Sequence, residues 1–199
     1  MARFLASSRH SCALISPHMI AWQREILEAF AASGGISVGI GQCAEDSVEY
    51  RTKRLSVKGS ELTVRVSDMQ GQSNKSKTSE ALTEAAGVML VYDAQVAESF
   101  ANAKAWYEFV QKQTSELRHK KKIILVGNGG HARQQVSPTE VSAFASKNSL
   151  ACFETASELG GGVIEAFTEI ATQVAEDYTN LCSGKANVSA KNEKDCVIS

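Results

Sequence analysis

The chain has 199 residues, 43% of them hydrophobic, with 21 Lys and Arg against 22 Asp and Glu, which predicts one ordinary soluble domain with an adequate core. A net charge of −1 provides no global basic field, so no nucleic-acid partner is expected. No apolar stretch approaches the roughly 20 residues of a membrane-spanning helix, and Met1–Ser11 lacks a signal-peptide core, so we expect a cytosolic chain. The five cysteines form no CxxC pair, which argues against both a disulfide framework and a zinc site.

Short apolar runs rich in β-branched residues alternate with segments of helical period, a pattern typical of a parallel sheet with crossover helices. The predicted strands, in chain order, are Cys12–Ile15, Val48–Val57, Glu61–Asp68, Gly87–Tyr92, Ile123–Val126 and Ala151–Phe153. The second and third flank Lys58-Gly59-Ser60 and form the one antiparallel hairpin that we predict. The polar stretch before this hairpin, up to about Asp46, is expected to be a connection without a strand.

Four helices are predicted from apolar residues at helical spacing. Their apolar positions are Met19, Trp22, Ile26 and Phe30; Phe100, Ala103, Tyr107 and Val110; Val141, Phe144 and Ala145; and Val163, Phe167, Ile170 and Val174. Ser137-Pro138-Thr139-Glu140 predicts a capping box at the start of the third helix. From Cys182 the composition turns polar and loses periodicity, so we expect a domain over residues 1–181 and a flexible tail over 182–199.

Five stretches in this order resemble the Ras superfamily of small GTPases, and its Rab branch in particular, over about Cys12 to Tyr178. They are Val48-Glu49-Tyr50-Arg51-Thr52-Lys53, Asp68-Met69-Gln70-Gly71-Gln72, Val91-Tyr92-Asp93 followed by Glu98-Ser99-Phe100, Val126-Gly127-Asn128, and Glu154-Thr155-Ala156-Ser157. The resemblance implies a P-loop NTPase-like α/β fold. This fold is a three-layer sandwich around a six-stranded, mostly parallel sheet with one antiparallel edge hairpin.

The resemblance also implies a nucleotide site with GTP or GDP and Mg²⁺ as cofactors. Asp68 would lie in the magnesium shell, the Gly71 amide would meet the terminal phosphate, and Gln72 would be the catalytic residue that orients water. Asn128 and Ala156 would belong to the loops that contact the base. A structural reading competes with this one, in which Asp68 anchors the segment after its strand, Gly71 serves a turn and Gln72 is exposed.

The phosphate loop of this family is replaced. The family has G-x-x-x-x-G-K-[ST], whose backbone amides wrap the phosphates while its lysine neutralises them. Here the first strand runs into Ser16-Pro17-His18-Met19, with no glycine and no lysine. Proline removes one amide, and without glycine the backbone does not readily adopt the positive-φ conformations of such a loop. We expect His18 to be a surface or helix-start residue rather than a phosphate ligand.

The base-reading and switch positions are altered as well. The family's N-K-x-D becomes Asn128-Gly129-Gly130-His131, and the loss of the bidentate aspartate costs about 1.5–3 kcal/mol of binding. The S-A-K element aligns with Ala156-Ser157-Glu158 or Thr155-Ala156-Ser157, and its lysine is absent. Glu45 stands where the switch threonine would complete magnesium coordination, and its carboxylate has the wrong sign for a polyphosphate, although a carboxylate can itself ligate Mg²⁺.

Cys196-Val197-Ile198-Ser199 matches the C-a-a-X box of farnesylated proteins. It predicts modification by a prenyltransferase and attachment to the cytoplasmic leaflet of a membrane. One lipid with the weak basic signal of Lys185, Lys191 and Lys194 predicts exchange between membrane and cytosol. Cys182 is either palmitoylated or packs at the end of the last helix as a small apolar residue.

The preferred hypothesis is a Rab-like pseudo-GTPase with a degraded nucleotide site. It would be a lipid-anchored protein-interaction module in vesicle-mediated or intracellular protein transport. Effector, coat or tether proteins would bind the switch-like segments, Gln42–Tyr50 and Gly71–Thr83. One alternative is a working GTP-binding switch that uses Asp68, Gly71 and Gln72. Another is an unrelated domain of flavodoxin or response-receiver type, which the antiparallel hairpin disfavours because those sheets are parallel.

Overall fold

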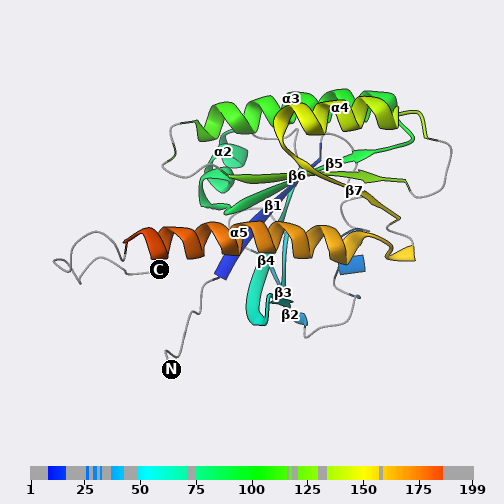
Figure 1. Ribbon diagram of the computed structural model, residues 1–199. Helices are drawn as coiled ribbons and strands as arrows, with labels where there is room; N and C mark the ends of the chain where they lie inside the picture. Colours follow the sequence, from blue (N-terminus) through cyan, green and yellow to red (C-terminus); the bar gives the residue numbers. More distant parts are fainter. Residues whose placement is uncertain are drawn as a thin grey trace.

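The computed structural model describes residues 9–16, 26, 29–30, 32, 37–42, 49–70, 75–115, 117, 121–129, 134–156 and 159–185 (Figure 1). The strands are β1 (Arg9–Ser16), β2 (Ser37–Gln42), β3 (Glu49–Val57), β4 (Ser60–Gln70), β5 (Gly87–Asp93), β6 (Lys122–Asn128) and β7 (Ala151–Thr155). The helices are α2 (Lys75–Glu84), α3 (Ala97–Thr114), α4 (Pro138–Asn148) and α5 (Val163–Lys185). Helices α3 and α4 lie on one side of the sheet and α5 on the other, which gives a layered α/β arrangement.

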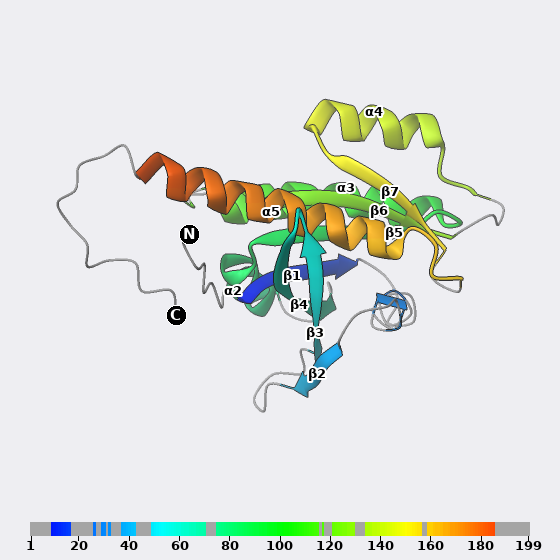
Figure 2. The same ribbon diagram turned by 60° about the horizontal axis from the view of Figure 1, so that its bottom comes forward.

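The strands form one mixed sheet in the order β2-β3-β4-β1-β5-β6-β7. Neighbours from β4 to β7 are parallel, whereas β3 is antiparallel to both β2 and β4. The prediction of six strands with one antiparallel pair was therefore wrong, because β2 adds a seventh strand at the edge (Figure 2). Glycines at positions 39 and 41 alternate with Val38 and Ile40, and because glycine weakens a strand interior, the stretch was expected to be a connection.

The predicted hairpin is confirmed, and its turn has the expected chemistry. Lys58 and Gly59 link β3 to β4 with φ angles of +50° and +77°, as a two-residue hairpin turn requires. Along β4, Val64 and Val66 are buried and Leu62 packs beside them, in agreement with the predicted alternation. The register of β3 on β4 follows directly from this short turn.

Two apolar clusters, one on each face of the sheet, share the central strands β5 and β6. Toward α5 these strands direct Met89, Val91, Ile124 and Val126. Toward α3 they direct Val88, Leu90, Tyr92, Ile123 and Leu125. Burial on both faces explains why these strands appear in the sequence as continuous apolar runs rather than as alternating ones.

Helix α4 starts at the predicted position but without the predicted capping box. Ser137 precedes the helix in extended conformation and makes no side-chain cap hydrogen bond. Its carbonyl oxygen accepts a bond from the amide of Val141. Glu140 instead forms an ion pair with Lys104 of α3, at 2.7 Å. The sequence Ser137-Pro138-Thr139-Glu140 therefore predicts where the helix starts. The Glu140 side chain, which would have completed the capping box, contacts Lys104 instead.

The second switch-like segment contains α2, which the sequence did not reveal because Lys, Ser and Thr dominate it. Leu82 anchors it in the cluster toward α3, and Thr78 is also buried. The hydroxyl of Ser79 donates to the side chain of Gln113 on α3 at 3.0 Å. Packing of Leu82 and hydrogen bonds to Gln113 and Lys121 thus hold a helix whose sequence is mostly polar.

A buried lysine connects β3 to the predicted first helix. Lys53 is only 1% exposed, and its ammonium donates to the carbonyl oxygen of Phe30. The same Nζ lies 4.9 Å from the centre of the Phe30 ring, and burial lowers the pKa of this lysine. Phe30 itself stacks on Phe167 of α5. Of the first predicted helix, residues 26, 29, 30 and 32 are described and are helical, while the rest lies outside the described residues.

Helix α5 confirms the predicted apolar face, with Val163, Phe167, Ile170 and Val174 all buried. It ends at Lys185, so Cys182 belongs to the helix and not to the predicted tail. The later part of the tail, with Cys196, lies outside the described residues. Across the described ranges, no helix is both long and apolar enough to cross a bilayer.

Two glycines in the loop before α5 offer a matched test of packing. Gly160 and Gly162 both have positive φ, +70° and +74°. A Cβ on Gly160 would meet open space, whereas one on Gly162 would collide with the carbonyl oxygen of Glu154. We expect Gly162→Ala to lower the free energy of unfolding by about 3 kcal/mol and Gly160→Ala by about 1 kcal/mol, measured by urea denaturation. Equal losses would contradict the close approach of this loop to β7.

Candidate functional site

The described candidate residues lie toward one edge of the sheet, where the parallel strands have their carboxyl ends. Asp68 lies near the end of β4 and pairs in register with Leu14 of β1. Asn128 is the last residue of β6, and Ala156 follows the last residue of β7. This edge is where ligands bind in open parallel sheets. The predicted residues Gly71 and Gln72, together with His18 and Glu45, lie outside the described residues.

The ends of β6 and β7 meet in a buried polar junction. The Thr155 hydroxyl donates to Oδ1 of Asn128 at 3.0 Å, and these residues are 2% and 1% exposed. The Gly129 amide donates to the carbonyl oxygen of Thr155 at 3.1 Å. The Ala94 amide, just after β5, donates to the carbonyl oxygen of Asn128 at 2.7 Å. Asn128 therefore joins loops from three strands.

The backbone of Ala156 is also bonded within the protein. Its amide donates to the carbonyl oxygen of Gly161 at 3.0 Å, and its carbonyl oxygen accepts from the amide of Leu159 at 3.0 Å. These bonds close a short loop between β7 and α5. The Ala156 amide is consequently already paired and does not point freely toward a ligand.

The segment that leads into α4 is hydrogen-bonded to the end of β5. The amides of Gln135 and Val136 both donate to the carbonyl oxygen of Ala94, at 2.9 and 3.1 Å. At Asp93 the carboxylate accepts from the amide of Gln95 at 2.8 Å, so this acid stabilises the turn into α3. These backbone and side-chain groups at the strand ends are therefore hydrogen-bonded to one another.

Only part of the predicted nucleotide and metal site lies among the described residues, which include Asp68, Asn128 and Ala156 but not His18, Glu45, Gly71 or Gln72. The Asn128 oxygen and the Ala156 amide are engaged in the protein, and the base loop has Gly129 where the family has lysine. Within the described part of the chain, no three His, Cys, Asp or Glu side chains converge on a point where a metal ion could bind.

Thr155 is the site residue that sequence reasoning missed as a functional contact. In the sequence it belongs to Glu154-Thr155-Ala156-Ser157, the stretch that resembles a base-contacting element, and the sequence alone does not identify its bonding partner. The available signal was positional, because Thr155 ends β7 and pairs in register with Asn128, which ends β6. Two polar residues at adjacent buried strand ends are expected to hydrogen-bond to each other.

The junction between β6 and β7 is tested with Thr155→Val, which keeps the shape and removes the hydroxyl. Asn128 would lose its 3.0 Å partner in a buried place, so we expect the free energy of unfolding to fall by about 2 kcal/mol. Thr83→Val on α2 is the control, because its hydroxyl bonds to the carbonyl oxygen of Ser79 in an exposed position. A change of no more than about 0.5 kcal/mol is expected there. If urea denaturation gave equal effects for both variants, the junction would not be a stabilising contact.

Comparison with known proteins supplies the family. A family model described as the Ras family matches residues 43–176. Ras-related protein RABA1c of Arabidopsis thaliana is 30% identical over 154 residues, which cover 74% of this chain and 70% of that protein. Ras-related protein Rab-18 of Lymnaea stagnalis is 29% identical over 137 residues, covering 68% and 67% respectively. Ras-related protein Rab11E of Lotus japonicus is 32% identical over 130 residues, covering 64% and 58%. Since the match spans well over half of the chain, the protein belongs to the Ras family and is similar to its Rab-related members.

Proposed function

We propose that this Ras-family chain is a Rab-like pseudo-GTPase, which acts by binding proteins without requiring a guanine nucleotide. The observation that carries the proposal is the sequence Ser16-Pro17-His18-Met19, which starts at the last residue of β1. A phosphate-binding loop needs glycines that turn successive amides toward the anion and a lysine that neutralises it. This segment provides neither, and positioning with electrostatics supplies nearly all of phosphoryl-transfer catalysis.

The base-binding loops support the same proposal. Asn128-Gly129-Gly130-His131 lacks the lysine and the aspartate that would recognise guanine. The remaining asparagine is committed to Thr155, and the amide of Ala156 to Gly161. A nucleotide would therefore gain no charged contact from this loop. Both the base and the phosphates would therefore be weakly held.

A second candidate function is a working GTP-binding switch. Its support is Asp68-x-x-Gly71-Gln72, which retains the family's residues for magnesium, the terminal phosphate and water. Asp68 lies at the strand-end edge where such a role would place it. This candidate predicts magnesium-dependent retention of guanine nucleotide and a hydrolysis rate reduced by Gln72→Leu.

The partners we propose are effector, coat or tether proteins in vesicle-mediated or intracellular protein transport. The role rests on similarity to Rab-related proteins. The contact surface would be the two switch-like segments, Gln42–Tyr50 and Gly71–Thr83. In the described residues, the first contains the end of β2 and the start of β3, and the second contains most of α2. A surface built from a strand edge and a helix suits protein recognition.

We also propose that the chain is lipid-anchored to the cytoplasmic face of a membrane through Cys196. The support is the C-a-a-X sequence Cys196-Val197-Ile198-Ser199, which a prenyltransferase would recognise. One isoprenoid gives reversible attachment, so the protein would exchange between membrane and cytosol. The folded domain would then be presented to partners at the membrane surface.

The absence of bound nucleotide is the first prediction of this function. Purified protein, denatured and cleared by centrifugation, should release no stoichiometric GDP or GTP, measured by ion-exchange chromatography of the supernatant. A small GTPase with an intact phosphate loop, purified in parallel, provides the control and should release about one nucleotide per molecule, as expected for tight binding. Stoichiometric guanine nucleotide from this chain would favour the working switch instead.

Membrane attachment is tested with Cys196→Ser in cells, followed by fractionation of the tagged protein. We expect the membrane-bound fraction to be lost, because the thiol that would carry the isoprenoid is absent. Cys182→Ser is the matched control and should retain the membrane fraction if that cysteine only packs at the end of α5. An unchanged membrane fraction for Cys196→Ser would overturn the lipid proposal.

A further inference from the structure

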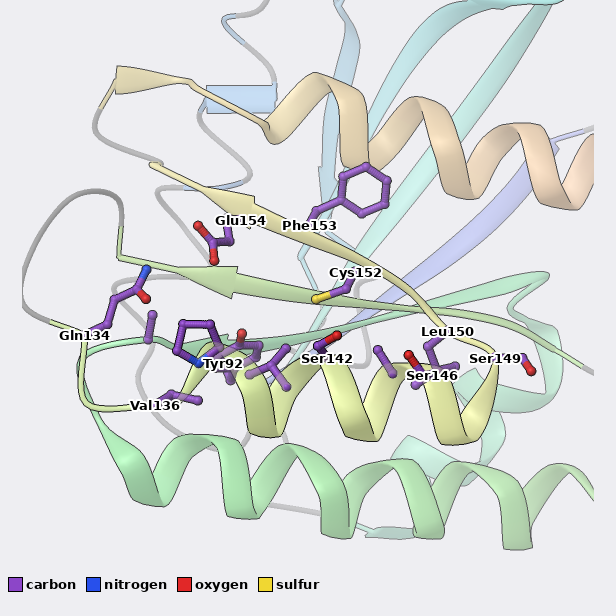
Figure 3. Close-up of a pocket in the computed structure, with 14 residues that line it drawn as sticks. Tyr92, Gln134, Val136, Ser142, Ser146, Ser149, Leu150, Cys152, Phe153 and Glu154 are labelled. Carbon is purple, nitrogen blue, oxygen red and sulfur yellow. The ribbon is translucent and has the colours of Figure 1, made fainter.

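A pocket of about 340 Å³ lies between α4 and the edge strand β7, apart from the hydrogen-bonded junction of β6 and β7 (Figure 3). Its lining comes from α4, the segment before it, β7 and the end of β5. The residues are Tyr92, Ala94, Gln134, Val136, Pro138, Val141, Ser142, Ala145, Ser146, Ser149, Leu150, Cys152, Phe153 and Glu154. This volume is at the lower end of the range for small-molecule sites.

The pocket exists because small side chains face each other across this interface. Phe144, the large residue of α4, packs edge-on against Phe100 and Tyr107 of α3, at 5.9 and 5.5 Å between ring centres. On β7, Phe153 points toward α5, and Cys152 points to the opposite side, toward α4 (Figure 3). The helix is therefore anchored on α3, while its serine-rich side and β7 leave space between them.

A buried phenol lines this space, and no described residue is bonded to its hydroxyl. Tyr92 is 4% exposed, and its hydroxyl makes no hydrogen bond within the described residues. Buried hydroxyls in folded proteins are normally bonded, and the described residues supply no such partner to the Tyr92 hydroxyl. Burial raises the pKa of Tyr92, and the nearby Cys152 and Glu154 raise it further, so the phenol is neutral and can donate or accept a hydrogen bond.

The polar lining favours a positively charged ligand. Glu154 is the one charged residue among those that line the pocket, and its side chain is exposed. The hydroxyls of Ser142, Ser146 and Ser149, like that of Tyr92, can all accept hydrogen bonds from an ammonium group. Burial and Glu154 raise the pKa of the Cys152 thiol, which keeps it protonated and adds no second negative charge. An anion would meet Glu154 with no lysine or arginine in the lining to offset the repulsion.

We propose that this pocket binds a small organic cation that has a primary ammonium group on an apolar body. The ammonium group would be bonded by the Glu154 carboxylate and the Tyr92 hydroxyl. The apolar body would pack on Val136, Val141 and Leu150 of the lining. The proposal does not rest on the pseudo-GTPase function, because it uses none of the hydrogen-bonded groups of Asn128, Thr155 or Ala156.

The test is a titration of the full-chain protein with benzylamine, followed by amide chemical shifts in ¹H–¹⁵N NMR spectra. We expect saturable shifts with a Kd of about 1 mM, the range for a ligand of this size. Benzyl alcohol is neutral and benzoate is negative, and both are close to benzylamine in shape. We expect each to bind at least about tenfold more weakly, because only the ammonium forms a charge-assisted bond with Glu154.

Substitutions in the pocket show whether benzylamine binds there. Glu154→Gln should weaken benzylamine binding about tenfold, whereas Glu165→Gln, an exposed carboxylate on α5 outside the pocket, should leave the Kd unchanged. Tyr92→Phe should weaken it as well, by a smaller factor. Ser146→Leu changes an exposed residue of α4 and fills the pocket, so it should abolish the shifts while circular dichroism reports an intact fold. Equal affinity for the three probes, no saturable shift, or unchanged binding to Glu154→Gln or Ser146→Leu would each overturn the proposal.

Discussion

The hydrogen bond from the Thr155 hydroxyl to Asn128 is the contact on which the strand-end site depends. Both residues are almost fully buried, so neither polar group has water as an alternative partner. The same two residues bond to the amides of Gly129 and Ala94 through their carbonyl oxygens. Ala94 in turn holds the segment that leads into α4. This buried pair therefore holds the ends of β6 and β7 side by side. Through the backbone bonds it also positions the residues that follow β5 and β6.

The proposal that this Ras-family chain works without a nucleotide rests instead on the residues that its loops lack. In an open parallel sheet, a ligand is recognised by unpaired groups on the loops at the carboxyl ends of the strands. Here the base loop Asn128-Gly129-Gly130-His131 lacks the lysine and the aspartate that would contact guanine. The sequence after β1 lacks the residues of a phosphate loop. Packing of the two clusters keeps the Ras-family sheet, while we propose that the contacts which would recognise GTP have been lost.

Patterns within single segments predicted most of the fold. Continuous apolar runs predicted β5 and β6, and Lys58-Gly59-Ser60 predicted the hairpin, because each depends only on neighbouring residues. Features that depend on distant partners were missed. Strand β2 forms by pairing with β3 despite its glycines, and the burial of Lys53 depends on a carbonyl group from the first helix. Of the candidate site, Asp68, Asn128 and Ala156 lie at the expected edge, but the bond from Asn128 to Thr155 requires knowledge of how β6 and β7 align.

The central claim, that this Ras-family protein does not need guanine nucleotide, is tested most directly by binding in solution. Isothermal titration calorimetry of the full chain with GDP and with a non-hydrolysable GTP analogue, with and without Mg²⁺, measures that affinity. The account predicts no saturable heat at micromolar nucleotide concentrations and no effect of Mg²⁺, because neither the base nor the phosphates would gain charged contacts. A micromolar or tighter Kd that depends on Mg²⁺ would contradict it.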